Sequence, residues 1–178
     1  MTKYVALLRA INVGGNNIIK MDALRAEFEK MGFQSVKTYI QSGNVLFESY
    51  LSDKLEIEKK IEKALAEKFK YNARVLIRSQ KDMKNVVSSF PEIFSDTNWK
   101  HNVIFLSELI DSKEILKNLE TKGKEIEQTF YSKGVLFWSA NMDTITRSNM
   151  LKLSARKEYK EMTVRNINTT RKILELMG

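Results

Sequence analysis

Two stretches of this chain repeat the same strand and hairpin pattern, and this repeat is the strongest constraint on its fold. The hairpin pattern of residues 38–49 matches that of residues 129–139, and the glycines at the two turns lie 91 positions apart. The apolar run 4–8, ahead of the first hairpin, likewise matches residues 102–106. Because a pattern that recurs along a chain indicates repeated structural units, we interpret the chain as two halves related by duplication.

The first half is predicted from hydrophobic spacing. Apolar residues recur at helical spacing from Met21 to Met31, and Gly32 ends that helix. Ser52 or Asp53 is the expected cap of a second helix. The predicted elements are a strand at 3–9, a helix at 21–31, hairpin strands at 36–41 and 44–49, a helix from 52 or 53 to about 70, a strand at 73–78 and a short helix before residue 90.

The second half follows the same order. Asp111 and Glu114 resemble a capping pair, and Asn168 or Thr169 is the expected cap of the last helix. The predicted elements are a strand at 101–107, a helix at 111–119, a hairpin at 126–139, a helix near 146–153, a strand at 162–164 and a helix at 169–177. The chain's only proline lies in 90–99, the candidate boundary between domains at 1–95 and 96–178. We therefore expect an α+β protein of two ferredoxin-like (βαββαβ) halves with a C-terminal helical extension.

The first half contains polar residues that the repeat does not need. Its first strand leads to a helix through residues 10–20, whereas the second half makes the same connection with residues 108–110. The second hairpin also lacks a counterpart of Asn44. In a ferredoxin-like sheet the long loop meets the turn of the first hairpin, and Arg9 lies near Asn44. We therefore place the candidate site in the first half.

This loop and hairpin combine one guanidinium with amide groups and paired glycines, which suit recognition of a small anion. A carboxylate, Asp22, already occupies the first turn of the following helix, and simple turn formation by glycine and asparagine remains an alternative. Arg165 and Asn166 could complete the site from the other half. The candidate ligand-binding residues are Arg9, Asn12, Gly14, Gly15, Asn16, Asn17, Gln41, Ser42, Asn44, Arg165 and Asn166.

Two further functions remain open. The segment 147–172 has eight basic and two acidic residues, a net charge of +6, which favours nucleic acid, acidic lipid or a phosphorylated metabolite. An amide-rich pocket could also stabilise an oxyanion in a metal-free enzyme, although no base can be named. His101, the only histidine, is interpreted as a structural polar residue. We expect neither a metal nor a cofactor.

The residues of the candidate site also resemble a known family. Residues 4–17, Met21, residues 38–45 and the C-terminal residues 163–166 resemble the bacterial family called domain of unknown function 1697. Ala10 departs from the family pattern, in which glycine is usual. The resemblance implies a cytoplasmic bacterial protein of two ferredoxin-like halves, and it implies no activity, substrate or catalytic residue. The lack of cysteine and of an apolar membrane-spanning segment fits that location.

Overall fold

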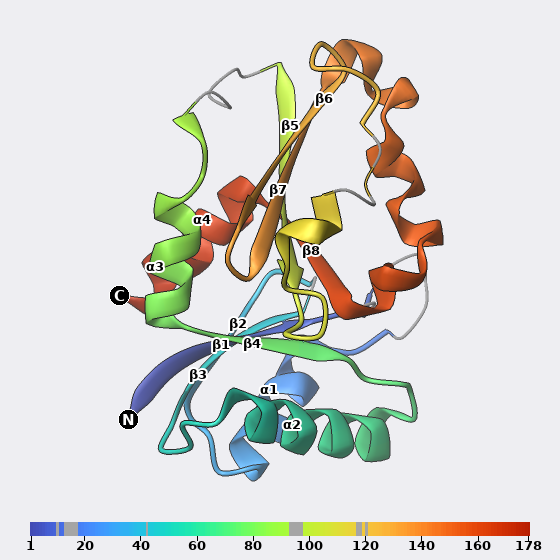
Figure 1. The fold of residues 1–178 in the computed structure, drawn as a ribbon. Helices are drawn as coiled ribbons and strands as arrows, with labels where there is room; N and C mark the ends of the chain where they lie inside the picture. The colour runs from blue at the N-terminus through green and yellow to red at the C-terminus, as the bar shows by residue number, and fades with distance from the viewer. Residues whose placement is uncertain (10, 13–17, 42, 93–97, 117–118, 120) are drawn as a thin grey trace. The chain divides into compact units, whose positions relative to one another are not determined.

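Two four-stranded antiparallel sheets organise the chain (Figure 1). The structure, a computed structural model, describes all residues except 10, 13–17, 42, 93–97, 117–118 and 120. The chain divides into two units. Unit 1 consists of Met1–Lys84 and Lys172–Gly178, and unit 2 consists of Asn85–Arg171. The fold is therefore mixed, with one sheet and several helical segments in each unit.

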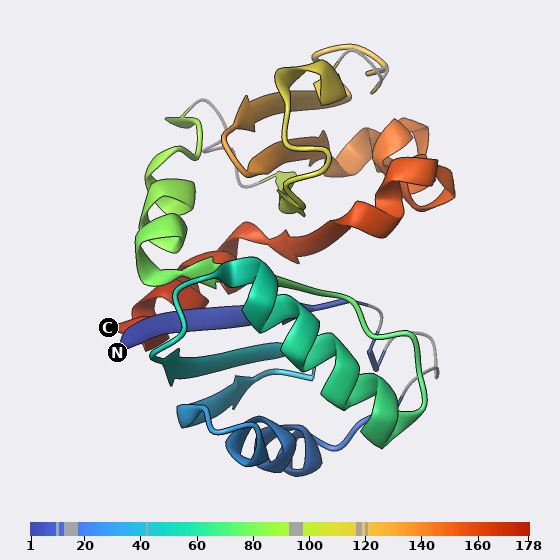
Figure 2. The same cartoon turned by 60° about the horizontal axis from the view of Figure 1, so that its bottom comes forward.

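Unit 1 places two helices on one face of its sheet, as Figures 1 and 2 show. The strands lie in the order β2-β3-β1-β4. The elements are β1 (Thr2–Leu8), α1 (Met21–Lys30), β2 (Gln34–Tyr39), β3 (Asn44–Ser49), α2 (Lys54–Phe69), β4 (Val75–Ser79) and the start of α3 (Gln80–Ser88). All six elements predicted before α3 are present, with small differences at their ends.

The core of unit 1 follows from two periodicities. Alternate β1 residues, including Tyr4 and Ala6, face the helices because side chains alternate across a strand. Ile57, Ile61 and Leu65 recur every four residues and give α2 a buried apolar stripe. Asp53 caps this helix, since its carboxylate accepts hydrogen bonds from the backbone N–H groups of residues 55 and 56. The predicted cap is confirmed at position 53.

Unit 2 has the strand order β6-β7-β5-β8, which is equivalent to that of unit 1. Short 3-10 helices join its strands. The elements are the end of α3, β5 (Trp99–Leu106), η2 (Lys113–Leu116), β6 (Glu127–Ser132), β7 (Val135–Asn141), η3 (Met142–Arg147), η4 (Asn149–Ala155), η5 (Lys157–Glu161), β8 (Met162–Asn166) and the start of α4 (Ile167–Met177). The last turns of α4 belong to unit 1.

The predicted helix at 111–119 is wrong in type, because the described residues there form the 3-10 helix η2. The proposed pairing of Asp111 with Glu114 is also wrong. The hydroxyl of Ser112 accepts from the Glu114 N–H, whereas Asp111 accepts from the Tyr131 hydroxyl and the Gly134 N–H. Asp111 is thus used to hold the hairpin and does not start an α-helix.

The predicted helix near 146–153 is replaced by η3, η4 and η5. The chain is extended at Ser148 and Arg156, with ψ of 135° and 145°, and each break ends one 3-10 helix and begins the next. Ser148 is buried, and its hydroxyl binds Glu127 and also accepts from the Met150 N–H. A serine side chain that competes for backbone groups in this way prevents a continuous helix.

The cap expected for the last helix lies earlier in the chain. Asn166 Oδ1 accepts a hydrogen bond of 2.8 Å from the Asn168 N–H, and α4 begins at Ile167. Asn166 is therefore the cap in place of Asn168 or Thr169. Among the described residues, no helix is both long and apolar enough to span a membrane.

Candidate functional site

The end of β1 is fixed on both sides before the candidate loop begins. The Leu8 N–H donates to the Gly43 carbonyl oxygen over 2.8 Å, which joins β1 to the turn of the β2–β3 hairpin. The next N–H, that of Arg9, donates to the Arg74 carbonyl oxygen over 2.9 Å. Arg9 is half-buried. Its guanidinium therefore starts from a rigid point of the backbone.

Asn12 joins the two ends of the loop to each other and to the hairpin. Its Oδ1 accepts from the Ile19 N–H over 2.7 Å, and its Nδ2 donates to the carbonyl oxygens of Ile19, over 3.1 Å, and Gln41, over 2.9 Å. The backbone of Asn12 is left-handed, with φ of 52°, a conformation that asparagine tolerates better than most residues. The predicted meeting of loop and hairpin is present in these contacts.

The hairpin turn packs closely against the end of β1. A Cβ atom at Gly43 would lie 2.8 Å from Leu8 Cβ and 2.9 Å from Ile11 Cδ1, and φ at this glycine is +75°. Asn44 is fully buried, and its Nδ2 donates to the Tyr39 carbonyl oxygen over 3.1 Å. The turn therefore needs glycine for both conformation and space.

Of the other candidate residues in unit 1, the structure describes only Gln41. Gln41 is exposed, and its carbonyl is the group that meets Asn12. Gly14, Gly15, Asn16, Asn17 and Ser42 lie outside the described residues. What is described is therefore the base of the candidate site, with the amides of Asn12 and Asn44 bound to backbone groups of the protein itself.

Arg165 and Asn166 lie in unit 2, where each has a contact of its own. Arg165 is 8% exposed, and its Nη1 donates to the Val164 carbonyl oxygen over 2.9 Å. Burial lowers the pKa of Arg165 to about 10, against a smaller opposing effect of Tyr159. Arg78 of β4, which the sequence analysis did not single out, makes the same contact with the Ile77 carbonyl oxygen.

His101 has a side-chain hydrogen-bond partner that was not predicted from the sequence. Its Nδ1 lies 2.8 Å from the hydroxyl oxygen of Ser139, the residue opposite it in the β5–β7 ladder. Ser139 is fully buried, so its hydroxyl is closed to a substrate. The pair therefore supports a structural interpretation of His101.

Glu127 is a buried acidic residue that the sequence analysis missed. It is 1% exposed, and its Oε2 accepts from Trp138 Nε1 over 3.0 Å and from the Ser148 hydroxyl. Its Oε1 accepts from the Lys122 N–H over 2.8 Å. These donors satisfy the carboxylate, which makes it a structural anchor. In the described part of the chain, no group of three or more acidic or histidine side chains is placed to hold a metal ion.

Comparison with known proteins gives the family of the chain. The model of the family described as "Protein of unknown function (DUF1697)" matches residues 1–137, which include the whole of the loop and hairpin site. The chain belongs to this family.

A solved structure extends the likeness of this DUF1697 protein beyond the matched residues. The conserved bacterial protein SP0830 from Streptococcus pneumoniae has 27% sequence identity, and the match covers 99% of each chain with a TM-score of 0.86. No curated protein matches the chain. The family has no assigned function, so the function must be argued from the site itself.

Proposed function

We propose that the loop after β1 and the β2–β3 hairpin of unit 1 bind a small anionic ligand, with Arg9 as the cationic contact. The observation that carries the proposal is the set of three hydrogen bonds that the Asn12 side chain makes, one accepted from the Ile19 N–H and two donated to the carbonyl oxygens of Ile19 and Gln41. One side chain thereby joins residue 12 to residue 19 and to the hairpin. Connections whose two ends are held together are frequently functional.

The residues then have separate roles. A guanidinium pairs well with carboxylate or phosphate, and Arg9 supplies one next to the closed loop. Backbone N–H groups of Gly14 and Gly15, with Asn16, Asn17 and Ser42, are proposed to contact the ligand. Asn12 and Asn44 are positioning residues in this proposal, because their amides bind backbone carbonyls. Arg165 and Asn166 are not needed by it.

Inorganic phosphate and acetate, titrated calorimetrically, are the probes that test this site. Arg9→Gln is expected to weaken the binding of at least one probe by about tenfold or more, because one charge-assisted contact is lost. Arg25→Gln is the matched control, since Arg25 lies on α1 in surface ion pairs with Asp22 and Glu29. Absence of binding to the unmodified protein, or equal affinity in both variants, contradicts the proposal.

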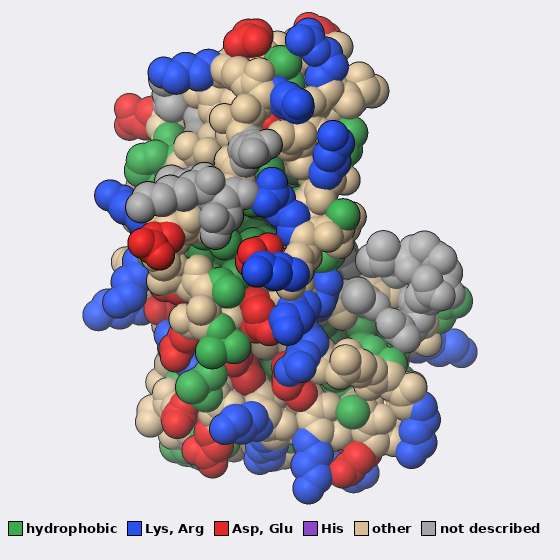
Figure 3. All heavy atoms as spheres, turned by 45° about the vertical axis from the view of Figure 1, so that its right-hand side comes forward, with side chains coloured by type: hydrophobic (Ala, Val, Ile, Leu, Met, Phe, Trp, Pro, Cys, Tyr) green, Lys and Arg blue, Asp and Glu red, His purple; other side chains and the backbone are tan. Residues whose placement is uncertain are grey.

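A second candidate function is nucleic-acid binding by the basic segment 147–172. Four basic side chains of η3, η4 and η5 are exposed, namely Arg147, Lys152, Lys157 and Lys160. Figure 3 shows Lys and Arg side chains on the face that carries these segments. Binding to a single strand should then weaken with salt, with a log–log slope of about −0.7 per phosphate contacted. Salt-independent binding, or the same slope after Lys157→Gln and Lys160→Gln, contradicts this function.

We also propose that the two sheets arose by duplication of one ferredoxin-like βαββαβ unit. Val5 pairs with Arg78 and Val103 pairs with Arg165, so the two arginines have equivalent places in the two ladders. Each donates to the carbonyl oxygen of the residue before it over 2.9 Å. An experimental structure with different strand orders in the two sheets would contradict the duplication.

The division into domains at 1–95 and 96–178 and a location in the bacterial cytoplasm remain proposals. The lack of cysteine suits a reducing compartment. Limited proteolysis should cut first within residues 90–99, and cell fractionation should recover the protein with cytoplasmic markers. A first cut elsewhere, or recovery with the membrane or periplasm, contradicts the corresponding proposal.

A further inference from the structure

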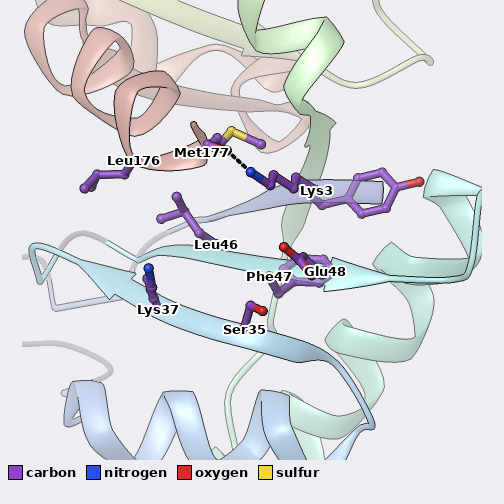
Figure 4. A pocket seen from close by; sticks show the side chains of 9 residues that line it. Lys3, Ser35, Lys37, Leu46, Phe47, Glu48, Leu176 and Met177 are labelled. Atoms are coloured by element: carbon purple, nitrogen blue, oxygen red, sulfur yellow. Dashed lines mark hydrogen bonds between the residues drawn. The ribbon is translucent and has the colours of Figure 1, made fainter. Parts of the chain in front are cut away.

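A hollow lies in unit 1, on the face of the sheet opposite α1 and α2. It has a volume of about 150 Å³ and lies between strands β2 and β3 and the end of α4. Figure 4 shows Lys37, Leu46 and Glu48 rising from the ladder toward Leu176 and Met177. Leu176 is 40% exposed and Leu46 is buried, and both line the hollow, which therefore has apolar walls as well as charged ones.

Glu48 lacks the partner that its place in the sheet predicts. Lys3 lies directly opposite Glu48 in the β1–β3 ladder, where opposite charges normally pair. Instead, Lys3 Nζ donates to the Met177 carbonyl oxygen over 2.8 Å, at the end of α4 (Figure 4). Within the described part of the chain, the Glu48 carboxylate has neither a hydrogen bond nor an ion pair. It therefore remains available to a cationic group from outside.

Lys37 provides the opposite charge at the same hollow. It lies opposite Leu46 in the β2–β3 ladder, two residues from Glu48 along β3, and both Lys37 and Glu48 line the hollow. The β2–β3 ladder shifts register between Gln34 and Lys37, so the two strands are irregular beside Glu48. Among the described residues, the Lys37 ammonium also has no hydrogen bond or ion pair. The hollow is thus lined by one positive and one negative group that form no ion pair with each other.

We propose that this hollow binds a small zwitterion with the chemistry of an α-amino acid that has a branched apolar side chain. The ligand ammonium binds the Glu48 carboxylate, the ligand carboxylate binds Lys37, and the side chain lies against Leu46 and Leu176. An α-amino acid suits this lining because it carries one positive and one negative group beside its side chain, and each can form a charge-assisted hydrogen bond of about 2.8 Å. A volume near 150 Å³ holds a group the size of benzene.

This proposal is independent of the anion site at the loop after β1. The two sites share no residue, and Lys3 acts here only as a positioning residue that holds the last turn of α4. Failure of one proposal therefore leaves the other standing.

Isothermal titration with L-leucine is the direct test. We expect L-leucine to bind the full chain, and we expect N-acetyl-L-leucine, 3-methylbutylamine and glycine each to bind at least about tenfold more weakly. These three probes lack the ammonium, the carboxylate and the side chain, respectively. Absence of L-leucine binding up to about ten millimolar overturns the proposal. Equal binding of N-acetyl-L-leucine also overturns it, because the ligand would then be a simple anion.

Matched variants assign the binding to this hollow. Glu48→Gln and Lys37→Gln should each weaken L-leucine binding by about tenfold or more. Glu67→Gln and Lys63→Gln are the controls. Both residues are exposed on α2, and these substitutions change the net charge by the same amounts as Glu48→Gln and Lys37→Gln. Unchanged affinity in Glu48→Gln or Lys37→Gln overturns the proposal, as does an equal loss in the controls. Circular dichroism of all four variants verifies that the sheet is retained.

Discussion

In both units the end of the first strand is hydrogen-bonded to the turn of the hairpin. The side chain that supports this junction donates a hydrogen bond to the hairpin in unit 1 and accepts one from the hairpin in unit 2. In unit 1 the Leu8 N–H donates to the hairpin glycine carbonyl over 2.8 Å, and in unit 2 the Leu106 N–H does so over 3.0 Å. Beside this bond, Asn12 donates to the hairpin in unit 1, whereas Asp111 accepts from it in unit 2. The junction therefore does not require one residue type. In unit 1, Asn12 also joins the two ends of the longer connection through its hydrogen bonds with Ile19.

The second connection of each sheet differs more strongly. In unit 1 it is the α-helix α2, which packs through an apolar stripe at Ile57, Ile61 and Leu65. In unit 2 the connection consists of η3, η4 and η5, and the buried carboxylate of Glu127 accepts from the Ser148 hydroxyl at the break between the first two. One strand order is thus compatible with apolar packing in one unit and with polar anchoring in the other.

The largest effect expected from this comparison is at Glu127. Glu127→Gln keeps the shape but replaces one acceptor oxygen by an amide donor, which then faces the Trp138 N–H or the Lys122 N–H. We expect a loss of about 3 kcal/mol in the free energy of unfolding, because a buried N–H donor loses its acceptor. Urea denaturation measures it. Glu125→Gln, at an exposed position, is the control and should change stability by less than about 0.5 kcal/mol.

Gly43 should give the next largest effect. Gly43→Ala places a Cβ atom within 3 Å of Leu8 and Ile11 and forces a left-handed alanine, so we expect a loss of about 2–3 kcal/mol. Gly32→Ala is the control, because φ there is +87° but nothing lies within 4 Å of the added atom. It should lose only about 1 kcal/mol in thermal or urea unfolding. Equal losses in the two variants would show that the close approach of Gly43 to Leu8 and Ile11 does not contribute to the loss of stability.

The different roles of Asn12 as a donor and Asp111 as an acceptor can be tested by replacing the amide with a carboxylate in one and the carboxylate with an amide in the other. Asn12→Asp removes both donors to the carbonyl oxygens of Ile19 and Gln41, and we expect a loss of about 1–2 kcal/mol. Asp111→Asn keeps an oxygen that can accept from Tyr131 and Gly134, and the loss should stay below about 1 kcal/mol. Urea unfolding of the two variants under one condition makes the measurement. A larger loss of unfolding free energy in Asp111→Asn than in Asn12→Asp would contradict the assignment of Asn12 as an essential donor and Asp111 as a replaceable acceptor.

The sequence predicted those elements whose stability is local. Helices α1 and α2 were predicted because apolar residues at helical spacing and the cap at Asp53 lie within the helix or next to it. The breaks between η3, η4 and η5 were missed because Ser148 is held by Glu127, 21 residues away. Similarly, the sequence placed Asn12 in the site but not its role, which depends on its contact with Gln41, 29 residues away. Roles set by contacts distant in sequence need the fold.

The buried hydroxyl of Tyr71 in unit 1 differs from the buried carboxylate of Glu127 in unit 2, whose oxygens accept hydrogen bonds. The Tyr71 hydroxyl is buried, and it has no hydrogen-bond partner among the described residues. Burial, and secondarily the negative charge of Glu62, raises the pKa of Tyr71 to about 12. The folded protein therefore keeps this proton at a pH where the unfolded chain loses it.

Tyr71→Phe should thus have a small effect at neutral pH and a visible one at alkaline pH. Removing an unsatisfied hydroxyl should change stability by less than about 0.5 kcal/mol at pH 7. Because the folded-state pKa is raised, the stability from Tyr71 is complete below about pH 10 and is lost as the pH rises through about 12. Urea unfolding near pH 8 and pH 11 should show a smaller alkaline loss in Tyr71→Phe than in the unmodified protein. Tyr50→Phe, 81% exposed, should follow the unmodified protein, and an equal alkaline loss in both variants would contradict the assignment to Tyr71.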